Sequence, residues 1–382
     1  MQERGASRHS LPLPASRGGA RLAYRRAVLA FALCALTQPA FAQAPFYAGK
    51  QLSILINLSA GGPTDTEARL VARHIGKHIA GNPSIVPRNM TGAGGMVAAN
   101  WLGQVAPPDG LTLGFFTSVT SASATASPSL KVDITKYAFA GTGSGVSVTY
   151  TRKDTGGGLT SPDELVKKPE VWVGGLAVDS DKDLRLRLQL DMLGMKYRYV
   201  TGYPGAADVR LAIQRGEIQM TSESMPSYRA AVEPTLVDKG VAIALWIDVG
   251  DEANNPHPHE AKGIDATTFH DYFTRVKGKK PAGLEWEAFD TMNTLARGFE
   301  RILVMAPGTP KEAVEAVRKA LVALKGDEEY RRDAMAMMKF VPEYETSEAA
   351  EKIYREKAAP NPKIVAFYEK YVEEGRAQSA KK

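Results

Sequence analysis

Two successive units of strand, glycine-rich turn and helix occupy residues 52–117. In the first unit, the sequence predicts a buried strand over 52–58, a turn over 59–65 and a helix that opens at Thr66. The second unit repeats this order around the turn 89–95. Alternation of strands and helices in this manner favours an α/β fold built on a parallel sheet.

A glycine-rich turn that leads into a helix leaves backbone N–H groups unpaired and directed at one small volume. Neighbouring parallel strands end at the same edge of a sheet, where open α/β sheets bind ligands. A lone turn of this kind is often only a tight connection, but two in tandem favour an anion site. Neither turn has the Gly-Lys-Ser/Thr ending of a Walker A loop or the glycine spacing of a dinucleotide fingerprint.

Three segments of this stretch resemble motifs of the tripartite tricarboxylate transporter receptors, the Bug-type, TctC-like extracytoplasmic solute-binding proteins. Segment 59–69 is similar to that family's Pro-Gly-Gly-x-x-Asp motif with a following Ala-Arg. Segment 89–95 is similar to Asn-x-Pro-Gly-Ala-Gly-Gly, and 108–113 to Pro-Asp-Gly-Tyr-Thr-Leu. Near the other end, 306–310 is similar to Ala-Pro-x-Gly-Thr-Pro. The resemblance therefore covers nearly the whole chain after residue 42.

The resemblance implies an α/β, two-lobed, type II periplasmic-binding-protein-like fold with a ligand cleft between the lobes. It places lobe I in 43–147 and 300–382, with the terminal helices over that lobe, and lobe II in 148–299. It further implies a monomer that closes on a small carboxylate ligand and delivers it to membrane transporter subunits. Neither an enzymatic activity nor a cofactor or metal is implied.

The resemblance also implies that one ligand carboxylate is held by the two first-lobe turns, largely through backbone N–H groups and bridging waters. The corresponding positions are Ser59, Ala60, Gly61, Gly62, Asp65, Gly92, Ala93, Gly94 and Gly95. Asp65 has a second interpretation, as the cap of the helix that opens at Thr66. The polar run 118–129 offers further hydroxyls, although serine-rich loops are more often solvent-facing linkers.

A second α/β region begins near Ser161, which is followed by proline and two acidic residues in the order typical of a helix start. The β-α-β-α-β order that follows predicts a second parallel sheet. Candidate ligand contacts in this lobe are Gly205, Ala206, Asp208, Ser222 and Ser224.

The ligand's class stays open at this stage. A carboxylate facing the cleft at Asp208 or Glu223 would disfavour a dianionic ligand. Because this region departs from the family pattern, a monocarboxylate, a dicarboxylate and an aromatic acid are all compatible with the sequence. Segment 251–299 departs most from the family pattern and predicts a lengthened, partly helical insertion at the cleft rim.

Residues 1–42 have the features of a signal peptide. Arg25 and Arg26 precede the apolar run 27–36, and Ala40-Phe41-Ala42 has the small-x-small form of a cleavage site, which predicts a periplasmic protein beginning at Gln43. This leader contains the only cysteine, Cys34, so the mature chain has no disulfide. It also carries six arginines and one glutamate, which leaves +1 of the net charge of +6 for residues 43–382 and gives no support to nucleic-acid binding.

Two pairs of histidines raise the question of a metal site. His74 and His78 have the four-residue spacing of a helical zinc pair, but the intervening residues lack the glutamate of a zincin and no third ligand is obvious. His257 and His259 lie among prolines that more often mark a solvated turn. The sequence therefore predicts no metal site.

An exported hydrolase is the enzymatic alternative. Gly143-Ser144-Gly145 contains part of the Gly-x-Ser-x-Gly nucleophile elbow, and His270 is a candidate base without an identifiable partner. A ligand-sensing receptor for a signalling partner is the alternative without transport, because it would use the same closing lobes.

Overall fold

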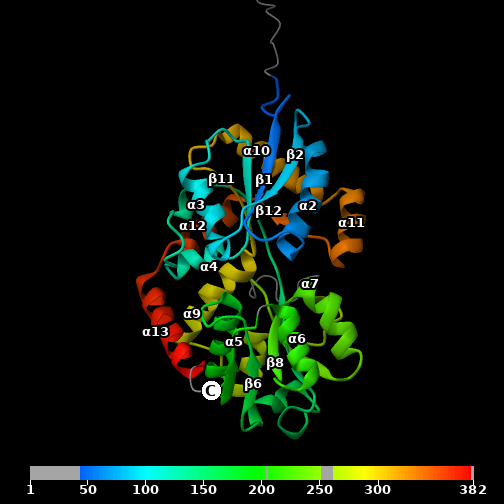
Figure 1. Cartoon of the computed structure of the whole chain (residues 1–382), viewed down its shortest axis with the longest axis vertical. Helices are drawn as coiled ribbons and strands as arrows, with labels where there is room; N and C mark the ends of the chain where they lie inside the picture. The colour runs from blue at the N-terminus through cyan, green and yellow to red at the C-terminus, as the bar shows by residue number, and fades with distance from the viewer. Residues whose placement is uncertain (1–43, 204, 251–260, 380–382) are drawn as a thin grey trace, which may run out of the picture. The chain divides into compact units, whose positions relative to one another are not determined.

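The computed structural model describes residues 44–203, 205–250 and 261–379. The chain divides into two units, Met1–Ala44 and Pro45–Lys382. Only Ala44 of the first unit is described, so the expected signal peptide and Cys34 lie outside the described residues. Two six-stranded sheets organise the second unit (Figure 1).

The first sheet, sheet A, has the strand order β12-β4-β11-β3-β1-β2. Strand β1 pairs in parallel with β2 and β3, whereas β11 is antiparallel to β3 and β4. The strands are β1 (Gln51–Ile56), β2 (Ser84–Asn89), β3 (Thr112–Phe116), β4 (Ala138–Gly143), β11 (Arg301–Met305) and β12 (Tyr344–Glu345).

Helices cover both faces of sheet A because its central strands are apolar on both sides. Ile54 and Ile56 of β1 lie in one buried cluster and Leu55 lies in another, as the two-residue period of a strand requires. The first cluster is shared with α2 (Pro63–Ile75), α10 (Lys311–Leu324) and α11 (Glu328–Met338). The second is shared with α3 (Met96–Gln104), α4 (Val119–Ala124) and α12 (Glu348–Ala358).

The second sheet, sheet B, has the order β10-β9-β5-β8-β6-β7. Strand β6 is parallel to β7 and β8, but β5 lies in the interior of the sheet and runs antiparallel to β8 and β9. The strands predicted for the second parallel sheet, β6 to β9, do run in one direction, and β5, which enters from sheet A, is inserted among them in the opposite direction. The strands are β5 (Ser147–Arg152), β6 (Val171–Gly174), β7 (Tyr197–Val200), β8 (Met220–Ser224), β9 (Ala242–Asp248) and β10 (Thr267–Thr268).

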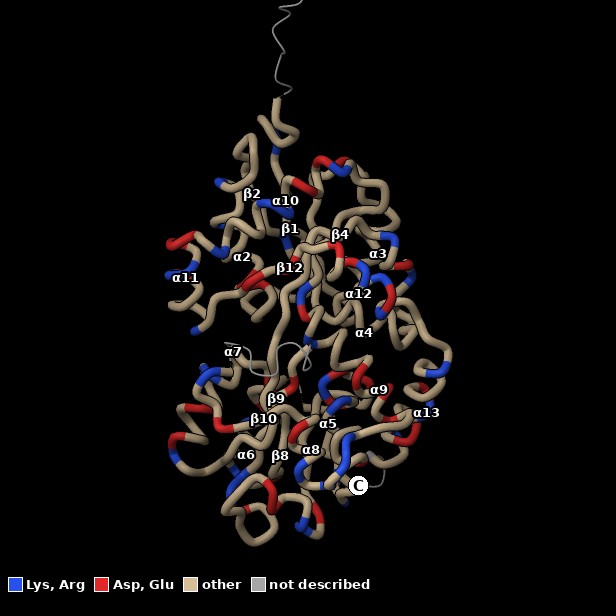
Figure 2. The backbone as a smooth tube through the Cα atoms, turned by 180° about the vertical axis from the view of Figure 1, so that it is seen from behind, with Lys and Arg blue, Asp and Glu red and all other residues tan. Residues whose placement is uncertain are grey.

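Two buried clusters also flank sheet B. One is shared with α5 (Asp181–Met192), α8 (Phe269–Lys277), α9 (Leu284–Asn293) and α13 (Pro362–Ser379). The other is shared with α6 (Ala206–Arg215), α7 (Met225–Ser227) and the π-helix η6 (Tyr228–Val237). Acidic and basic residues are interspersed around both sheets (Figure 2).

The last helix differs from the expectation that residues 300–382 all belong with the first lobe. Ile364, Tyr368 and Tyr371 of α13 lie in the buried cluster of sheet B, and α13 lies beside α9 (Figure 1). Prolines at 360 and 362 separate α12 from α13, which allows the chain to turn toward the other sheet. The apolar residues of α13 recur at helical spacing and need a partner surface, which α9 provides.

The chain passes between the two sheets at three crossings. The first is 144–146 between β4 and β5, the second is 294–300 between α9 and β11, and the third is 359–361 between α12 and α13. The second crossing contains the π-helix η8 (Thr294–Gly298). Three separate segments therefore connect the part of the chain around sheet A to the part around sheet B.

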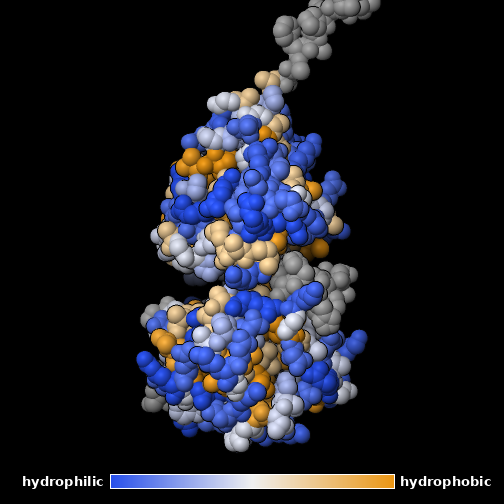
Figure 3. All heavy atoms as spheres, turned by 90° about the vertical axis from the view of Figure 1, so that its right-hand side faces the viewer, coloured by the Kyte–Doolittle hydropathy of each residue, from blue (hydrophilic) through white to orange (hydrophobic). Residues whose placement is uncertain are grey.

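The surface is mostly hydrophilic on the side seen in Figure 3, and its apolar residues lie in small groups. No helix in the described part of the chain is both long enough and apolar enough to cross a membrane.

Candidate functional site

The first glycine turn lies at the carboxyl end of β1, as predicted. Ser59, Ala60 and Gly61 are exposed. Gly61 has a φ of 81°, which favours glycine, and Gly62 is the N-cap of α2. The helix opens at Pro63, three residues before the expected Thr66, because proline at the first helical position needs no backbone N–H.

Asp65 is the third residue of α2 and is 3% exposed. Its carboxylate accepts hydrogen bonds from the Gly61 N–H at 2.8 Å, from Nδ2 of Asn89 at 2.9 Å and from Nε of Arg69 at 2.9 Å. Burial raises the pKa of Asp65, but the hydrogen bonds from Arg69, Gly61 and Asn89 outweigh it and hold the pKa below its usual value. The carboxylate is therefore engaged by groups that fix the turn.

Two asparagines tie together the strand ends beneath both turns. The Asn57 amide donates to the Thr117 carbonyl at 2.9 Å and accepts from the Thr117 N–H at 3.1 Å, which joins β1 to β3. The Asn89 amide donates to the Leu58 carbonyl at 2.8 Å, which joins β2 to β1. The sequence analysis did not single out either asparagine, although each directly follows or ends a strand.

The second glycine turn has four consecutive residues with positive φ: Gly92, Ala93, Gly94 and Gly95. Gly95 precedes α3 and packs on Asn57, since a Cβ at Gly95 would lie 2.3 Å from Nδ2 of Asn57. The other three residues are exposed. Ala93 holds a φ of 48° that non-glycine residues rarely adopt, and such conformations cluster at functional sites.

Two cavities, one of about 730 Å³ and one of about 980 Å³, are candidate sites. The larger one, called the cleft cavity below, is lined from both sheets. The loops and helices beside sheet A contribute Ala93, Gly94, Met96 and residues of the 118–129 run. The loops and helices beside sheet B contribute Asp179, Ser180, Asp181, Leu184 and Met292. Helix α13 contributes Tyr368, Glu369, Val372, Glu373 and Arg376. Of the predicted ligand residues, Ala93 and Gly94 are the two that line it.

The serine-rich run supplies hydroxyls to the cleft cavity. Ser118 lines it with a φ of 63°, and Ser121 lines it with 4% of its surface exposed. The Ser121 Oγ is buried and has no hydrogen-bond partner among the described residues. A buried hydroxyl without a partner is costly, so its retention beside a cavity indicates a ligand or water partner.

On the opposite wall of the cleft cavity, as at the first glycine turn, a carboxylate in the first turn of a helix accepts hydrogen bonds from backbone N–H groups of the preceding loop. Asp183 is the third residue of α5, and its Oδ2 accepts from the N–H groups of Leu176 at 2.6 Å and Ala177 at 2.9 Å, and from the Tyr199 hydroxyl at 2.7 Å. Ser180 is the N-cap and accepts from the Asp183 N–H. The sequence analysis missed Ser180 and Asp183; the spacing Ser-x-x-Asp before an apolar helix was the available signal.

The predicted second-lobe residues lie elsewhere. Gly205 caps α6, Asp208 is exposed in the first turn of α6, and Ser222 and Ser224 belong to β8. These residues and Ala206, the first residue of α6, are not among the residues that line the cleft cavity.

Glu223 does not present a free carboxylate to a ligand. It is 3% exposed and accepts from the Tyr150 hydroxyl at 2.9 Å, from Nε of Arg210 at 3.1 Å and from NH2 of Arg210 at 3.0 Å. The concern that Glu223 repels a dianion therefore falls away, because Arg210 neutralises it.

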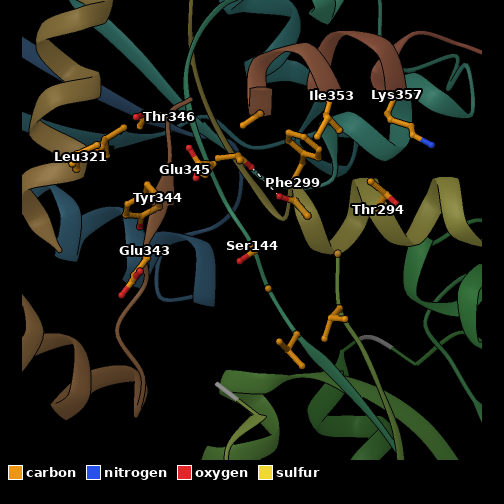
Figure 4. A pocket seen from close by; sticks show the side chains of 18 of the residues that line it. Ser144, Thr294, Phe299, Leu321, Glu343, Tyr344, Glu345, Thr346, Ile353 and Lys357 are labelled. Atoms are coloured by element: carbon orange, nitrogen blue, oxygen red, sulfur yellow. Dashed lines mark hydrogen bonds between the residues drawn. The ribbon is translucent and has the colours of Figure 1, made fainter. Parts of the chain in front are cut away.

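The smaller cavity, of about 730 Å³, lies beside the first two crossings and contains Ser144 (Figure 4). No histidine is among its lining residues. His270 is in α8, where it pairs with Asp271 at 3.3 Å and lies against the Trp286 ring. The residues proposed for a hydrolase are therefore not brought together.

The His74 and His78 pair contacts carboxylates of α11 and its cap. Nε2 of His74 lies 3.1 Å from Asp333, and Nε2 of His78 lies 2.8 Å from Asp327. His74, Asp327 and Glu329 together could hold a metal ion, so the structure supplies acidic groups that the sequence did not identify. Lys77 already binds Asp327 and Glu329 at 2.8 Å each. His257 and His259 lie outside the described residues.

The sequence matches no family model, and no curated protein is similar to it in sequence. Solved structures are similar in fold. A TctC solute binding protein from Polaromonas has a TM-score of 0.62 and 17% identity, with 86% of this chain and 99% of that chain covered. The R. palustris protein Rpa4515 with adipate has a TM-score of 0.57 and 20% identity, with 85% and 96% covered.

The periplasmic binding protein BugD has a TM-score of 0.53 and 16% identity, with 87% of this chain and 98% of that chain covered. These similarities span nearly the full length of each neighbour. They confirm the expected α/β, two-lobed architecture and the expected resemblance at the level of structure. The chain therefore has the fold of the TctC and BugD solute-binding proteins.

Proposed function

We propose that this chain is a periplasmic receptor that captures a small carboxylic acid in the cleft cavity and delivers it to a tripartite tricarboxylate-type membrane transporter. The observation that carries this proposal is the composition of that cavity. Ala93 and Gly94, which lead into α3, line one side, and Ser180, which caps α5, lines the other.

Helix starts favour anions because their first N–H groups lack intrahelical partners and carry the positive end of the helix dipole. The volume of about 980 Å³ lies at the upper end of the range of small-molecule sites. The adipate held by the R. palustris neighbour supports a carboxylate as the ligand class.

In this proposal, sheet A with its helices is lobe I, and sheet B with its helices, α13 included, is lobe II. A ligand in the cleft cavity contacts both lobes and so favours the closed arrangement. The first two crossings are joined by a hydrogen bond that the Gly145 N–H donates to the Arg297 carbonyl at 2.7 Å. Closure then moves the lobes about a narrow hinge.

A ligand-sensing receptor remains the alternative use of the same closure, and genes for two membrane subunits beside this one would favour transport. An exported hydrolase has less support because Ser144 and His270 lie in different places. A hit that is chemically unchanged after binding separates a receptor from an enzyme.

The first test is a thermal-shift screen of residues 43–382 against mono-, di- and aromatic carboxylic acids. A ligand at 100 times its Kd adds about 2.7 kcal/mol to the folded state, which raises the Tm measurably. If no acid shifts the Tm while an ester or amide is turned over, the receptor proposal fails.

A matched pair of variants then tests the location. Gly94 has a φ of 64°, and a Cβ there meets nothing within 4 Å, so asparagine and aspartate are both tolerated. Gly94→Asp places a negative charge at the carboxylate site, whereas Gly94→Asn has the same shape without the charge. We expect Gly94→Asp to bind the acid at least tenfold more weakly than Gly94→Asn. Equal affinities of the two variants would show that the ligand carboxylate does not bind at this turn.

A further inference from the structure

The two walls of the cleft cavity differ in charge. On the sheet A side, the lining residues between Ala93 and Ser129 are uncharged and offer hydroxyls and backbone groups. On the other side, the cavity is lined by four acidic residues, Asp179, Asp181, Glu369 and Glu373. Arg376 is the one basic residue among the lining residues. The formal charge of the lining is therefore negative on one wall alone.

The acidic residues are only partly neutralised. Asp179 lies 3.8 Å from Arg376, and Asp181 lies 4.0 Å from Arg297. Glu369 and Glu373 are exposed, stand one helical turn apart on α13 and have no ion pair with a described basic residue. Two uncompensated carboxylates therefore face any ligand that reaches this wall.

An acidic wall alone does not make a site, but the opposite wall has an independent feature. The Ser121 Oγ is buried without a partner beside the same cavity. On the acidic side, Leu184, Met292 and Val372 add apolar lining.

Resting on the proposed function, we propose that the ligand is an amino-bearing carboxylic acid, with its carboxylate at the uncharged wall and its ammonium group at the acidic wall. A dicarboxylate would bring its second negative charge toward Glu369 and Glu373, and like charges repel. An ammonium group at the same place would be attracted by the carboxylates of Glu369 and Glu373. An aliphatic spacer between the two groups would contact the apolar lining residues Leu184, Met292 and Val372.

The test compares matched pairs of acids that differ at one end. Each pair has one diacid and one amino acid of equal chain length: succinate with 4-aminobutanoate, glutarate with 5-aminopentanoate, and adipate with 6-aminohexanoate. Calorimetry on residues 43–382 measures the affinity of each. We expect the amino acid of the best-binding pair to bind at least tenfold more tightly than its diacid.

The outcomes separate the inference from the proposed function. If the diacid binds as tightly as its partner, or if no pair binds while another carboxylic acid does, the inference is overturned and the receptor stands. If no acid of any class binds, both fall.

A variant locates the selectivity. The double variant E369Q with E373Q removes two charges from exposed positions of α13, so the fold is little affected. We expect it to lower the preference for the amino acid at least fivefold. The control is Glu374→Gln, an adjacent position that lies 3.7 Å from Lys370 and does not line the cavity. An unchanged preference in the double variant would contradict the assignment of the α13 wall.

Discussion

Arg301 and Glu67 form a buried ion pair in which Nε and Oε2 are 2.8 Å apart, with 4% and 6% of their side chains exposed. The pair connects β11 to α2, the helix that follows the first glycine turn. Arg301 also binds Glu300 at 3.0 Å, and Arg297 lies 2.7 Å from Glu300 and 4.0 Å from Asp181 at the start of α5. A series of opposite charges thus runs from lobe I through the second crossing to lobe II.

Removing one member of this series leaves a buried charge uncompensated. Burial lowers the pKa of Arg301, but the carboxylates of Glu67 and Glu300 outweigh it and raise the pKa above its usual value, so the guanidinium stays charged. We expect Glu67→Gln to lower the free energy of unfolding by about 3 kcal/mol in chemical denaturation. Glu315→Gln, at an exposed pair with Arg318, is the control and changes it by less than about 1 kcal/mol. Equal effects of the two variants would mean that the pair is structurally unimportant.

The first crossing depends on glycine at position 145. A Cβ there would lie 1.6 Å from Oε2 of Glu300, so Gly145→Ala displaces Glu300 from Arg297 and Arg301. We expect a loss of about 2 to 3 kcal/mol in unfolding free energy, comparable to breaking a buried ion pair. Gly326→Ala serves as the control, because its Cβ would meet only the Ala323 oxygen at 3.9 Å. A neutral Gly145→Ala would show that Glu300 relocates without cost.

Acid should weaken the first turn through Asp65. Its folded pKa lies below its usual value, so its stabilising contribution is present above about pH 3.9 and is lost as the pH falls through the lower folded pKa. The difference in unfolding free energy between the wild type and Asp65→Asn should therefore be largest at neutral pH and shrink at pH 3. Asp238→Asn, at an exposed position before β9, is the control. A difference that is constant with pH would contradict the role of the Asp65 carboxylate.

The sequence predicted the two glycine turns well because the determinants are local. Positive φ at Gly61 and Gly92, and the apolar period of β1, are properties of a few neighbouring residues. The same holds for the helix starts, where the error at α2 was three residues.

The rest depended on packing between distant segments. Ser180 and Tyr368 line one cavity although 188 positions separate them. No local sequence pattern predicts that two such distant segments lie together. The partner of α13 and the direction of β5 also follow from the three crossings. The sequence alone also could not show whether the Glu223 carboxylate is free or paired, because its partner Arg210 lies 13 positions away in a different element.

An acid bound in the cleft cavity should draw the two lobes together. Residues 43–382 contain no cysteine, so spin labels can be attached at Lys239→Cys in lobe II and Arg332→Cys in lobe I, both exposed positions. Pulsed electron–electron double resonance then measures the distance between the two spin labels with and without the acid found in the screen. We predict a shorter and narrower distance distribution with the acid, and no change in the Gly94→Asp background. Tight binding measured by calorimetry with an unchanged distance distribution would contradict closure of the lobes on the acid.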